Sequence, residues 1–400
     1  MLRRPALPLF ALAAAPYAVL AQAAPADGDA PLLDSLLRTI PVFRDSVAPR
    51  AADFELQVLY RPLTGPDSGR TLTWGHAPAR YFYPASTVKL PVAALALERL
   101  ADLGFPADVV LEVDSVRAPQ STSRERVGLP GAPATVAGHV RDLGIASSNE
   151  AYNRLFEWLG PRAINRELHA RGLATRIVHR VGVGGFDAEE NRHLPPVRLL
   201  APGTGDTLLT RAATRVATPY ELAPTNQRKG VGRYDDEAGA VVDEPFDFAT
   251  KNFLALADLA AVLQAVVAPQ TVAPTQRFAL RAADRELLLA ALSTRPADSD
   301  NPLHRDRPDG YVNFLYYGGG GPWEADGPLI RNKVGDAYGT LTDAAAFSDP
   351  ATGRPLFVLA ATVLVNANGI YNDGVYEYEG IGFPLLRELG RGVWALWRGR

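Results

Sequence analysis

Strand-like patterns lie at both ends of the chain, and helical patterns fill the middle. Residues 55–62 alternate between apolar and polar side chains, and 71–75 follow as a hairpin partner across a turn rich in Gly, Pro and Asp. Three more strand-like runs come late, at 329–333, 338–347 and 356–365. Strands so far apart in sequence bury their apolar faces best in a shared sheet. We therefore expect an α+β fold, with an antiparallel sheet built from both termini, flanked by helices, and a central helical lobe.

The segments between these strands have the apolar spacing of helices. The expected helices cover 32–40, 86–103, 136–143, 149–159, 162–171, 254–267, 285–292 and 383–397. Gly160 and Gly172 are placed to end two of them, and Ser86 or Thr87 can cap a third. Residues 180–250 are irregular and rich in Pro, Gly and charge, and we interpret roughly 195–250 as an insertion.

The first residues have the pattern of an export signal. Two arginines precede an apolar run over 7–20, and the small-x-small cleavage pattern Ala21-Gln22-Ala23 follows it. The run is too short, and too interrupted by proline, to cross a bilayer. We expect a signal peptide at 1–23, a flexible leader at 24–30 and a folded unit over 31–400, in a periplasmic or secreted protein. No later segment has the length of a membrane-spanning helix.

The composition excludes several classes of protein. There is no cysteine, so a disulfide, a thiolate nucleophile and a cysteine-bound metal are all impossible. The six histidines lack the close spacing of a metal site, and the Gly-x-Ser-x-Gly motif of α/β-hydrolases is absent. The net charge is −3 and there is no basic stripe, so nucleic acid is not an expected partner. We expect a monomer that uses no metal or other cofactor.

The residues with the clearest chemistry are Ser86 and Lys89, at the start of an expected helix. Because they are three residues apart, their side chains share one face of that helix. A serine hydroxyl becomes a good nucleophile when a base removes its proton, and a lysine can be that base if burial or nearby cations lower its pKa. The chain has only four lysines among its 41 basic residues. Arginine cannot give up its proton, so a lysine at this position is consistent with a base.

Two later motifs carry matching polar groups. Ser147 and Asn149 open an expected helix, where either residue alone is most simply a helix cap. Lys333-Val334-Gly335 lies on a late strand, and alone it is a strand that ends in a turn. A second Ser-x-Asn motif, Ser299-Asp300-Asn301, lies in a polar loop before Pro302, between the wrong elements, so we reject it.

Together and in this order, the three motifs resemble the active site of the penicillin-recognising serine enzymes, and of class A β-lactamases in particular. The resemblance implies a β-lactamase-like fold in which Ser86 attacks the substrate carbonyl and Lys89 activates Ser86, alone or through water. It implies that Ser147 passes a proton to the leaving nitrogen, helped by the charge of Lys333. Asn149 would position an amide of the substrate's side chain.

The same resemblance indicates how the substrate would be held. The backbone N–H groups of Ser86 and of the residue after Gly335, which is Asp336, would form the oxyanion hole. Val334 stands where the family has a threonine or serine that helps to hold the substrate carboxylate. Arg331, two residues before the strand motif's lysine, lies on the same face of the strand and is a candidate replacement.

The base for deacylation is where the chain departs most from the family. The family holds the hydrolytic water with a glutamate in a Glu-x-x-Leu-Asn setting, whereas residues 186–192 here read Phe-Asp-Ala-Glu-Glu-Asn-Arg. Asp187, Glu189 and Glu190 are the available acids, and a base must reach the ester through one water. We favour Glu190, then Glu189, with Asn191 on the other side of the water.

Three functions remain open at this point. The resemblance covers most of 30–190 and 250–400, and it favours an exported serine hydrolase that opens β-lactams through a Ser86 acyl-enzyme. The first alternative is a penicillin-binding-type D,D-peptidase or transpeptidase that acts on a cell-wall peptide and releases β-lactams slowly. The second is a catalytically weak periplasmic binding or sensor module on the same scaffold. The substrate is accordingly a small molecule or a cell-wall peptide.

Overall fold

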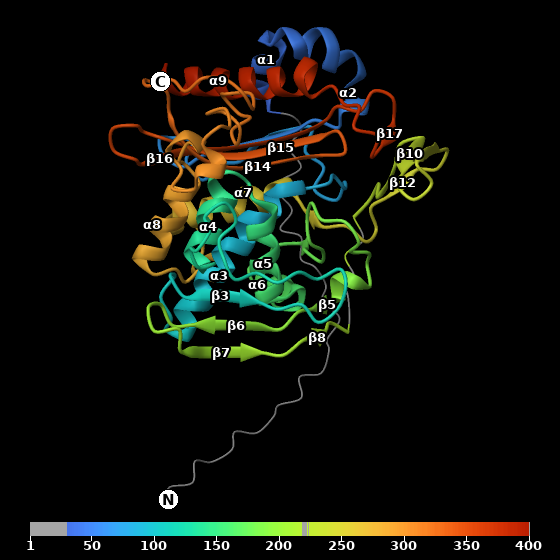
Figure 1. The fold of residues 1–400 in the computed structure, drawn as a ribbon. Coiled ribbons are helices and arrows are strands. Elements are labelled where there is room, and N and C mark those ends of the chain that lie inside the picture. Colours follow the sequence, from blue (N-terminus) through green and yellow to red (C-terminus); the bar gives the residue numbers. More distant parts are fainter. Residues whose placement is uncertain (1–29, 218–221, 223, 400) are drawn as a thin grey trace, which may run out of the picture.

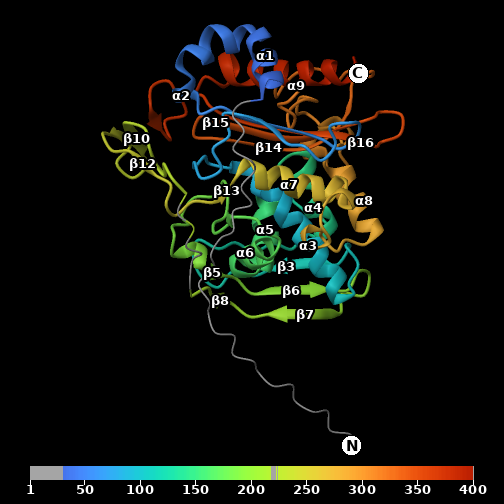
Figure 2. The same ribbon diagram turned by 180° about the vertical axis from the view of Figure 1, so that it is seen from behind.

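The computed structural model describes residues 30–217, 222 and 224–399. The expected signal peptide at 1–23, and all of the expected leader except Ala30, lie outside the described residues. The chain forms one large sheet with helices on both faces, as Figures 1 and 2 show from opposite sides. A smaller sheet lies at the far end of the helices from the large sheet.

The large sheet is antiparallel, with the strand order β14-β15-β16-β1-β2. Two strands come from the first part of the chain, namely β1 (Gln57–Pro62) and β2 (Leu72–Trp74). Three come from the last part, namely β14 (Leu329–Ala337), β15 (Thr340–Ser348) and β16 (Pro355–Leu364). Because β1 pairs with β16 along its whole length, the prediction of one sheet built from both ends of the chain is confirmed. Strand β14 lies at one edge of this sheet.

The two faces of the sheet belong to different hydrophobic cores. Side chains alternate along each strand, so Ala345 and Phe357 face one core while Ala344 and Val358 face the other. The first core is covered by α1 (Pro31–Thr39) and α9 (Phe383–Arg398). The second continues into the helical lobe, and α7 (Leu256–Val267) packs directly on the sheet there.

The helical lobe is built around α3 (Lys89–Leu103). Every residue from Lys89 to Glu98 is buried, and a helix that is buried on all sides must be surrounded by other elements. The surrounding helices are α4 (Val136–Ile145), α5 (Asn149–Leu159), α6 (Pro161–Ala170) and α8 (Ala282–Ala291).

Residues of the expected insertion pack against the protein in two places. In its first half, β6 (Val197–Leu200) and β7 (Thr207–Arg211) extend β3 (Val110–Val113) into the smaller sheet. In its second half, β10 (Gly232–Asp235) pairs with β11 (Ala240–Val242) and, in parallel, with β17 (Ile370–Tyr371). The shorter elements are α2 (Ala51–Phe54), β4 (Thr175–Arg176), β5 (His193–Leu194), β8 (Thr214–Arg215), β9 (Arg228–Lys229), β12 (Phe246–Asp247) and β13 (Phe253–Leu254).

Candidate active site

Ser86 lies in a short 3-10 turn, Ala85–Val88, that leads directly into α3. Ala85 has a φ of 45°, a left-handed conformation that costs a non-glycine residue on the order of 1 kcal/mol or more. Thr87 donates a hydrogen bond of 2.7 Å to the carbonyl of Pro84. The expectation that Ser86 or Thr87 caps the helix is wrong, because both hydroxyls have other partners and no side chain caps this turn.

Lys89 is fully buried, and oxygen atoms of three residues surround its Nζ. The Nζ lies 2.8 Å from Ser86 Oγ, 2.7 Å from Asn149 Oδ1 and 3.2 Å from Ser147 Oγ. It also donates to the backbone carbonyl of Ser147. This carbonyl and the Asn149 Oδ1 can accept a hydrogen bond but cannot donate one. They therefore take the two N–H groups of a neutral amine, and its lone pair is left for the Ser86 hydroxyl.

The pKa values of the two lysines support different roles. Burial lowers the pKa of Lys89 well below its usual value, and the charge of Lys333 lowers it further, whereas Asp336 opposes both effects. Burial also lowers the pKa of Lys333, to about 8. Near neutral pH, Lys89 is thus suited to accept a proton while Lys333 still carries its charge.

Ser147 stands between these two lysines. Its Oγ accepts a hydrogen bond of 2.9 Å from Lys333 Nζ and lies 3.2 Å from Lys89 Nζ. Its φ is 53°, so this residue too is held in the left-handed region. Ser148, rather than Ser147, caps α5, because its Oγ accepts from the backbone N–H of Ala151 at 3.2 Å. The Ser147 hydroxyl is therefore free to carry a proton between groups.

Strand β14 brings its glycine against the backbone of the nucleophile. A Cβ at Gly335 would lie 2.5 Å from the Pro84 carbonyl oxygen and 2.9 Å from the backbone nitrogen of Ser86. Only a residue without a side chain allows this approach. Asp336 follows directly on the strand, so the structure places the two backbones from which an oxyanion hole was predicted next to each other.

A loop segment closes over Asn149. Asn153 holds this segment, because its Nδ2 donates to the Val181 carbonyl at 3.1 Å and its Oδ1 accepts from the Val181 N–H at 2.9 Å. A Cβ at the next residue, Gly182, would lie 2.0 Å from Asn149 Nδ2. The residue that the loop brings against Asn149 is thus a glycine, which carries no acid.

Three motifs from distant parts of the chain therefore meet around one serine. A family model described as the beta-lactamase enzyme family matches residues 45–373. The chain belongs to the beta-lactamase enzyme family. The predicted relationship and the expected β-lactamase-like α+β fold are both confirmed.

Solved structures with the same fold are distant in sequence. A beta-lactamase from Burkholderia vietnamiensis is 15% identical, with a TM-score of 0.51, over 91% of this chain and 96% of that one. A beta-lactamase from Desulfarculus baarsii is 19% identical, with a TM-score of 0.49, over 92% and 98% of the two chains. No curated protein matches the chain. At these identities the structural likeness shows the fold alone.

The acidic residues of the loop at 187–190 are hydrogen-bonded to other residues of the chain. Glu190 Oε1 accepts a hydrogen bond of 2.7 Å from Arg117. Glu189 is bound by Arg215, and this contact lowers the pKa of Glu189 to about 2. Asp187 accepts from the backbone N–H of Glu190. Within the described ranges, none of the contacts of these three acids involves the serine and lysine side chains of the site.

The amide of Asn191 is likewise committed to the loop. Its Nδ2 donates to the carbonyls of Phe186 and Asp187, and its Oδ1 accepts from the backbone N–H of Arg180. Both N–H groups of the amide are therefore taken within the loop, and Asn191 shapes that loop.

The guanidinium of Arg331 is bound to groups outside the three motifs. Its Nη1 donates to Ser348 Oγ at 3.1 Å and to the Gly353 carbonyl at 3.2 Å. Lys333, two residues on, instead reaches Ser147. The two side chains share a face of β14, but they reach different partners, so the prediction that Arg331 binds substrate gains no support from the geometry.

The rejected motif at 299–301 has a structural role away from Ser86. Arg126 binds both Asp142 and Asp300, with contacts of 2.7 and 2.8 Å. Asn301 Nδ2 donates to the Val127 carbonyl and to Asp142. The literal match to the family motif is thus part of a clamp that joins this loop to α4.

An aromatic wall beside the site was not predicted from the sequence. Phe246 and Phe248, from the second half of the insertion, pack against Tyr338 with ring centroids 5.0 and 5.5 Å apart. Tyr83, three residues before Ser86, lies 5.1 Å from Tyr338 and 5.8 Å from Phe248. The insertion therefore packs against one residue that precedes the nucleophile's turn and another that follows β14. Its only signal in the sequence is an aromatic pair in an otherwise irregular stretch.

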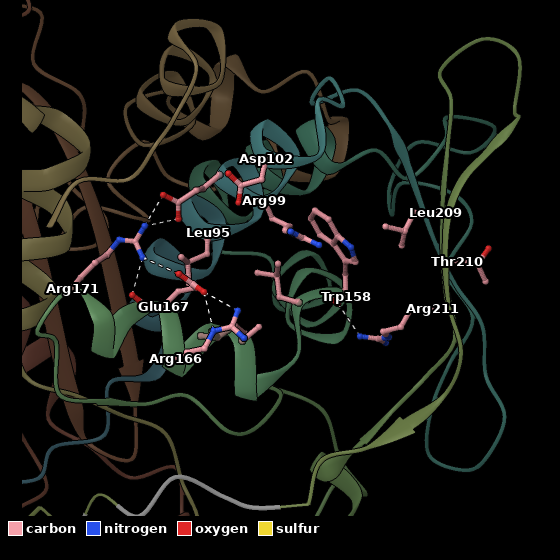
Figure 3. Close-up of a pocket in the computed structure, with 14 residues that line it drawn as sticks. Leu95, Arg99, Asp102, Trp158, Arg166, Glu167, Arg171, Leu209, Thr210 and Arg211 are labelled. Carbon is pink, nitrogen blue, oxygen red and sulfur yellow. Dashed lines mark hydrogen bonds and ion pairs between the residues drawn. The ribbon is translucent and has the colours of Figure 1, made fainter. Parts of the chain in front are cut away.

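A cavity of about 560 Å³ lies on another part of the helical lobe (Figure 3). Leu95, Trp158 and Leu209 give it an apolar lining, and several charged residues surround them. Arg171 is held there by Glu98 and Glu167. None of the predicted catalytic residues lines this cavity.

Two features are absent from the described residues. No helix in this part of the chain is long and apolar enough to cross a membrane. No group of three or more histidine and acidic side chains, within the same residues, is arranged to hold a metal ion.

Proposed function

We propose that this chain is an exported serine hydrolase that opens cyclic amides such as β-lactams through an acyl-enzyme on Ser86. The observation that carries the proposal is the 2.8 Å separation between Lys89 Nζ and Ser86 Oγ, with two pure acceptors on the remaining N–H groups of a neutral amine. A nucleophile in contact with an oriented base is the arrangement that covalent catalysis requires.

The acylation step follows from the contacts. Ser86 Oγ attacks the lactam carbonyl carbon while its proton passes to Lys89, and the developing oxyanion is met by the backbone N–H groups of Ser86 and Asp336. When the C–N bond breaks, the nitrogen takes a proton from Ser147, which is replaced from Lys89. The charge of Lys333, 2.9 Å from Ser147 Oγ, stabilises this transfer. Asn149 would orient an amide of the substrate's side chain.

A second function is favoured by the loop over Asn149. Asn153 holds Val181, the next residue, Gly182, lies against Asn149, and Glu190 is paired with Arg117. A carboxylate placed to activate the hydrolytic water is needed for fast release of the acyl group. Its absence from these contacts supports a penicillin-binding-type peptidase or transpeptidase, in which the same acyl-enzyme forms but is long-lived.

The location belongs to the proposal as well. The sequence pattern at 1–23 supports a signal peptide, and a periplasmic or secreted enzyme would meet both β-lactams and cell-wall peptides. N-terminal sequencing of the exported protein tests this directly. We expect a start near Ala24, and an intact Met1 would contradict it.

Intact-mass spectrometry of the mature protein with benzylpenicillin and a chromogenic cephalosporin tests the chemistry. We expect a mass increase equal to one β-lactam, located on Ser86 and absent in Ser86→Ala. Lys89→Arg should acylate at least about 100-fold more slowly, because arginine keeps the charge but cannot accept the proton. Acylation of Lys89→Arg at the wild-type rate would contradict the role of Lys89 as base.

The lifetime of the adduct separates the two functions. An adduct that is replaced by free enzyme and hydrolysed product within seconds indicates a β-lactamase. One that persists for hours indicates the penicillin-binding type. Variants that retain the wild-type unfolding midpoint exclude loss of fold as the cause of any change.

A further inference from the structure

Asp336 places a carboxyl group in the site that the acylation chemistry does not use. It follows Gly335, whose backbone touches the nucleophile's, and its side chain is exposed to solvent. The carboxyl interacts with the backbone N–H of Asp336 itself, which keeps it at this end of β14. Burial raises the pKa of this carboxyl, and the charges of Lys333 and Lys89 oppose that rise. It is therefore an open acidic group within the electrostatic reach of both lysines.

No cation neutralises this carboxyl at contact distance. Lys333 Nζ is directed at Ser147 Oγ and at the Val334 carbonyl. Lys89 Nζ is enclosed by the oxygens already described. In the part of the chain that the structure describes, no lysine, arginine or histidine lies within 4.0 Å of the Asp336 carboxylate. The carboxylate thus remains free to attract or repel a group on the substrate.

Aromatic side chains lie near the end of β14 that carries Asp336. Tyr338, two residues after Asp336, stands in the aromatic wall with Tyr83 and Phe246. The hydroxyl of Tyr378 accepts from the Gly339 N–H at 2.9 Å, and Tyr378 experiences the charge of Asp336. Among these rings, Tyr378 lies within reach of the Asp336 charge, and an aromatic face together with a carboxylate favours binding of an ammonium group.

The groups that would hold a substrate carboxylate are missing from the same place. Val334 has no hydroxyl and is buried in the core between the large sheet and helices α1 and α9. Arg331 binds Ser348 and Gly353 instead. A carboxylate on the substrate would meet the like charge of Asp336 with only Lys333 to offset it. The substrate carboxylate and the Asp336 carboxylate carry the same charge, and their repulsion opposes binding.

We propose that Asp336 sets the charge specificity of the site, so that it favours substrates with a cationic group, such as an ammonium, next to the scissile amide and disfavours those with a carboxylate there. The inference rests on the proposed acyl-enzyme function of Ser86. Asp336 acts here as a specificity-determining residue, through its charge, and it takes no proton in the reaction.

Three probes that share one β-lactam ring test this. Benzylpenicillin is anionic beside the scissile amide, its methyl ester is neutral, and its 2-(diethylamino)ethyl ester is cationic. The second-order rate of Ser86 acylation is measured by intact-mass spectrometry for the wild type, Asp336→Asn and Asp336→Glu. We expect the wild type to prefer the cationic ester over the acid, and Asp336→Asn to reduce that preference at least about tenfold, which corresponds to about 1.4 kcal/mol. Asp336→Glu should restore the preference.

The other possible results separate failure of the charge-specificity proposal from failure of the proposed function. If Asp336→Asn slows all three probes equally, the residue has a general role in catalysis or folding and the charge-specificity proposal is wrong. An unchanged ratio between cationic and anionic probes also overturns it. If no probe labels Ser86 in folded wild-type protein, the proposed function itself fails, and the inference fails with it.

Discussion

Replacing Lys333 by methionine should stabilise the fold while it disables the site. Lys333 is buried, and burial lowers its pKa from 10.5 to about 8. At about 1.4 kcal/mol for each pKa unit, keeping its charge inside the folded protein near pH 7 costs about 3 kcal/mol. Methionine is similar in length and uncharged. It would lose the hydrogen bond to Ser147 Oγ, worth about 1 kcal/mol, so we expect a net gain of about 2 kcal/mol in the free energy of unfolding.

The gain should depend on pH in a direction fixed by the pKa shift. Because the pKa of Lys333 is lower in the folded state, the wild type loses stability as pH falls from about 10.5 towards about 8, and the loss is complete below that range. The advantage of Lys333→Met should therefore fall from about 2 kcal/mol near pH 7 to about zero near pH 9.5. Urea unfolding of both proteins at the two pH values measures it.

A second buried lysine provides the contrast. Lys229 contacts Glu55 directly, so Lys229→Met should destabilise the fold by stranding a carboxylate. If the difference between Lys333→Met and wild type is the same at both pH values, Lys333 does not titrate in the fold as argued. If both lysine variants destabilise the protein equally, burial of the Lys333 charge is not the dominant cost.

Three further outcomes are expected. Gly335→Ala should reduce acylation at least about 100-fold, because its Cβ would meet the Pro84 carbonyl at 2.5 Å and move the strand from the nucleophile; wild-type acylation by this variant would show that the close approach is unnecessary. The acylation rate should rise with pH as Lys89 loses its proton and fall above about pH 8 as Lys333 does, so a stopped-flow profile without the alkaline decline would contradict the role of the Lys333 charge. Glu190→Gln should leave the lifetime of the acyl-enzyme within about twofold of wild type, because Arg117 already holds Glu190; a much longer-lived adduct by mass spectrometry would make Glu190 the base.

The sequence was sufficient for the parts of the fold that depend on local pattern. The apolar run at residues 356–365 and the apolar spacing of residues 86–103 correspond to β16 and α3 within a few residues. The meeting of Ser86, Ser147 and Lys333 around Lys89 was implied by the resemblance of the three motifs, in their order, to the family's active site, and local pattern alone would not have predicted it.

Local sequence pattern could not predict the contacts that long side chains make across loops. Glu190 meets Arg117, which lies 73 residues earlier in the chain, and Arg331 turns to the loop around Gly353. A flexible side chain with several charged neighbours has no partner fixed by its own position. The packing of Phe248 against Tyr83 depends on where the insertion returns to the protein, and no local pattern encodes that return.

The position of β14 also bears on how the protein fails when it is stressed. Its nine residues form the outermost strand of the large sheet, and the turn that carries Ser86 covers part of its open side. An uncovered edge strand is a template for pairing with another chain. Partial separation of the helical lobe from the sheet would uncover the unpaired backbone groups of β14 and would also take the site apart. Heat-damaged molecules would therefore aggregate through the strand that serves catalysis.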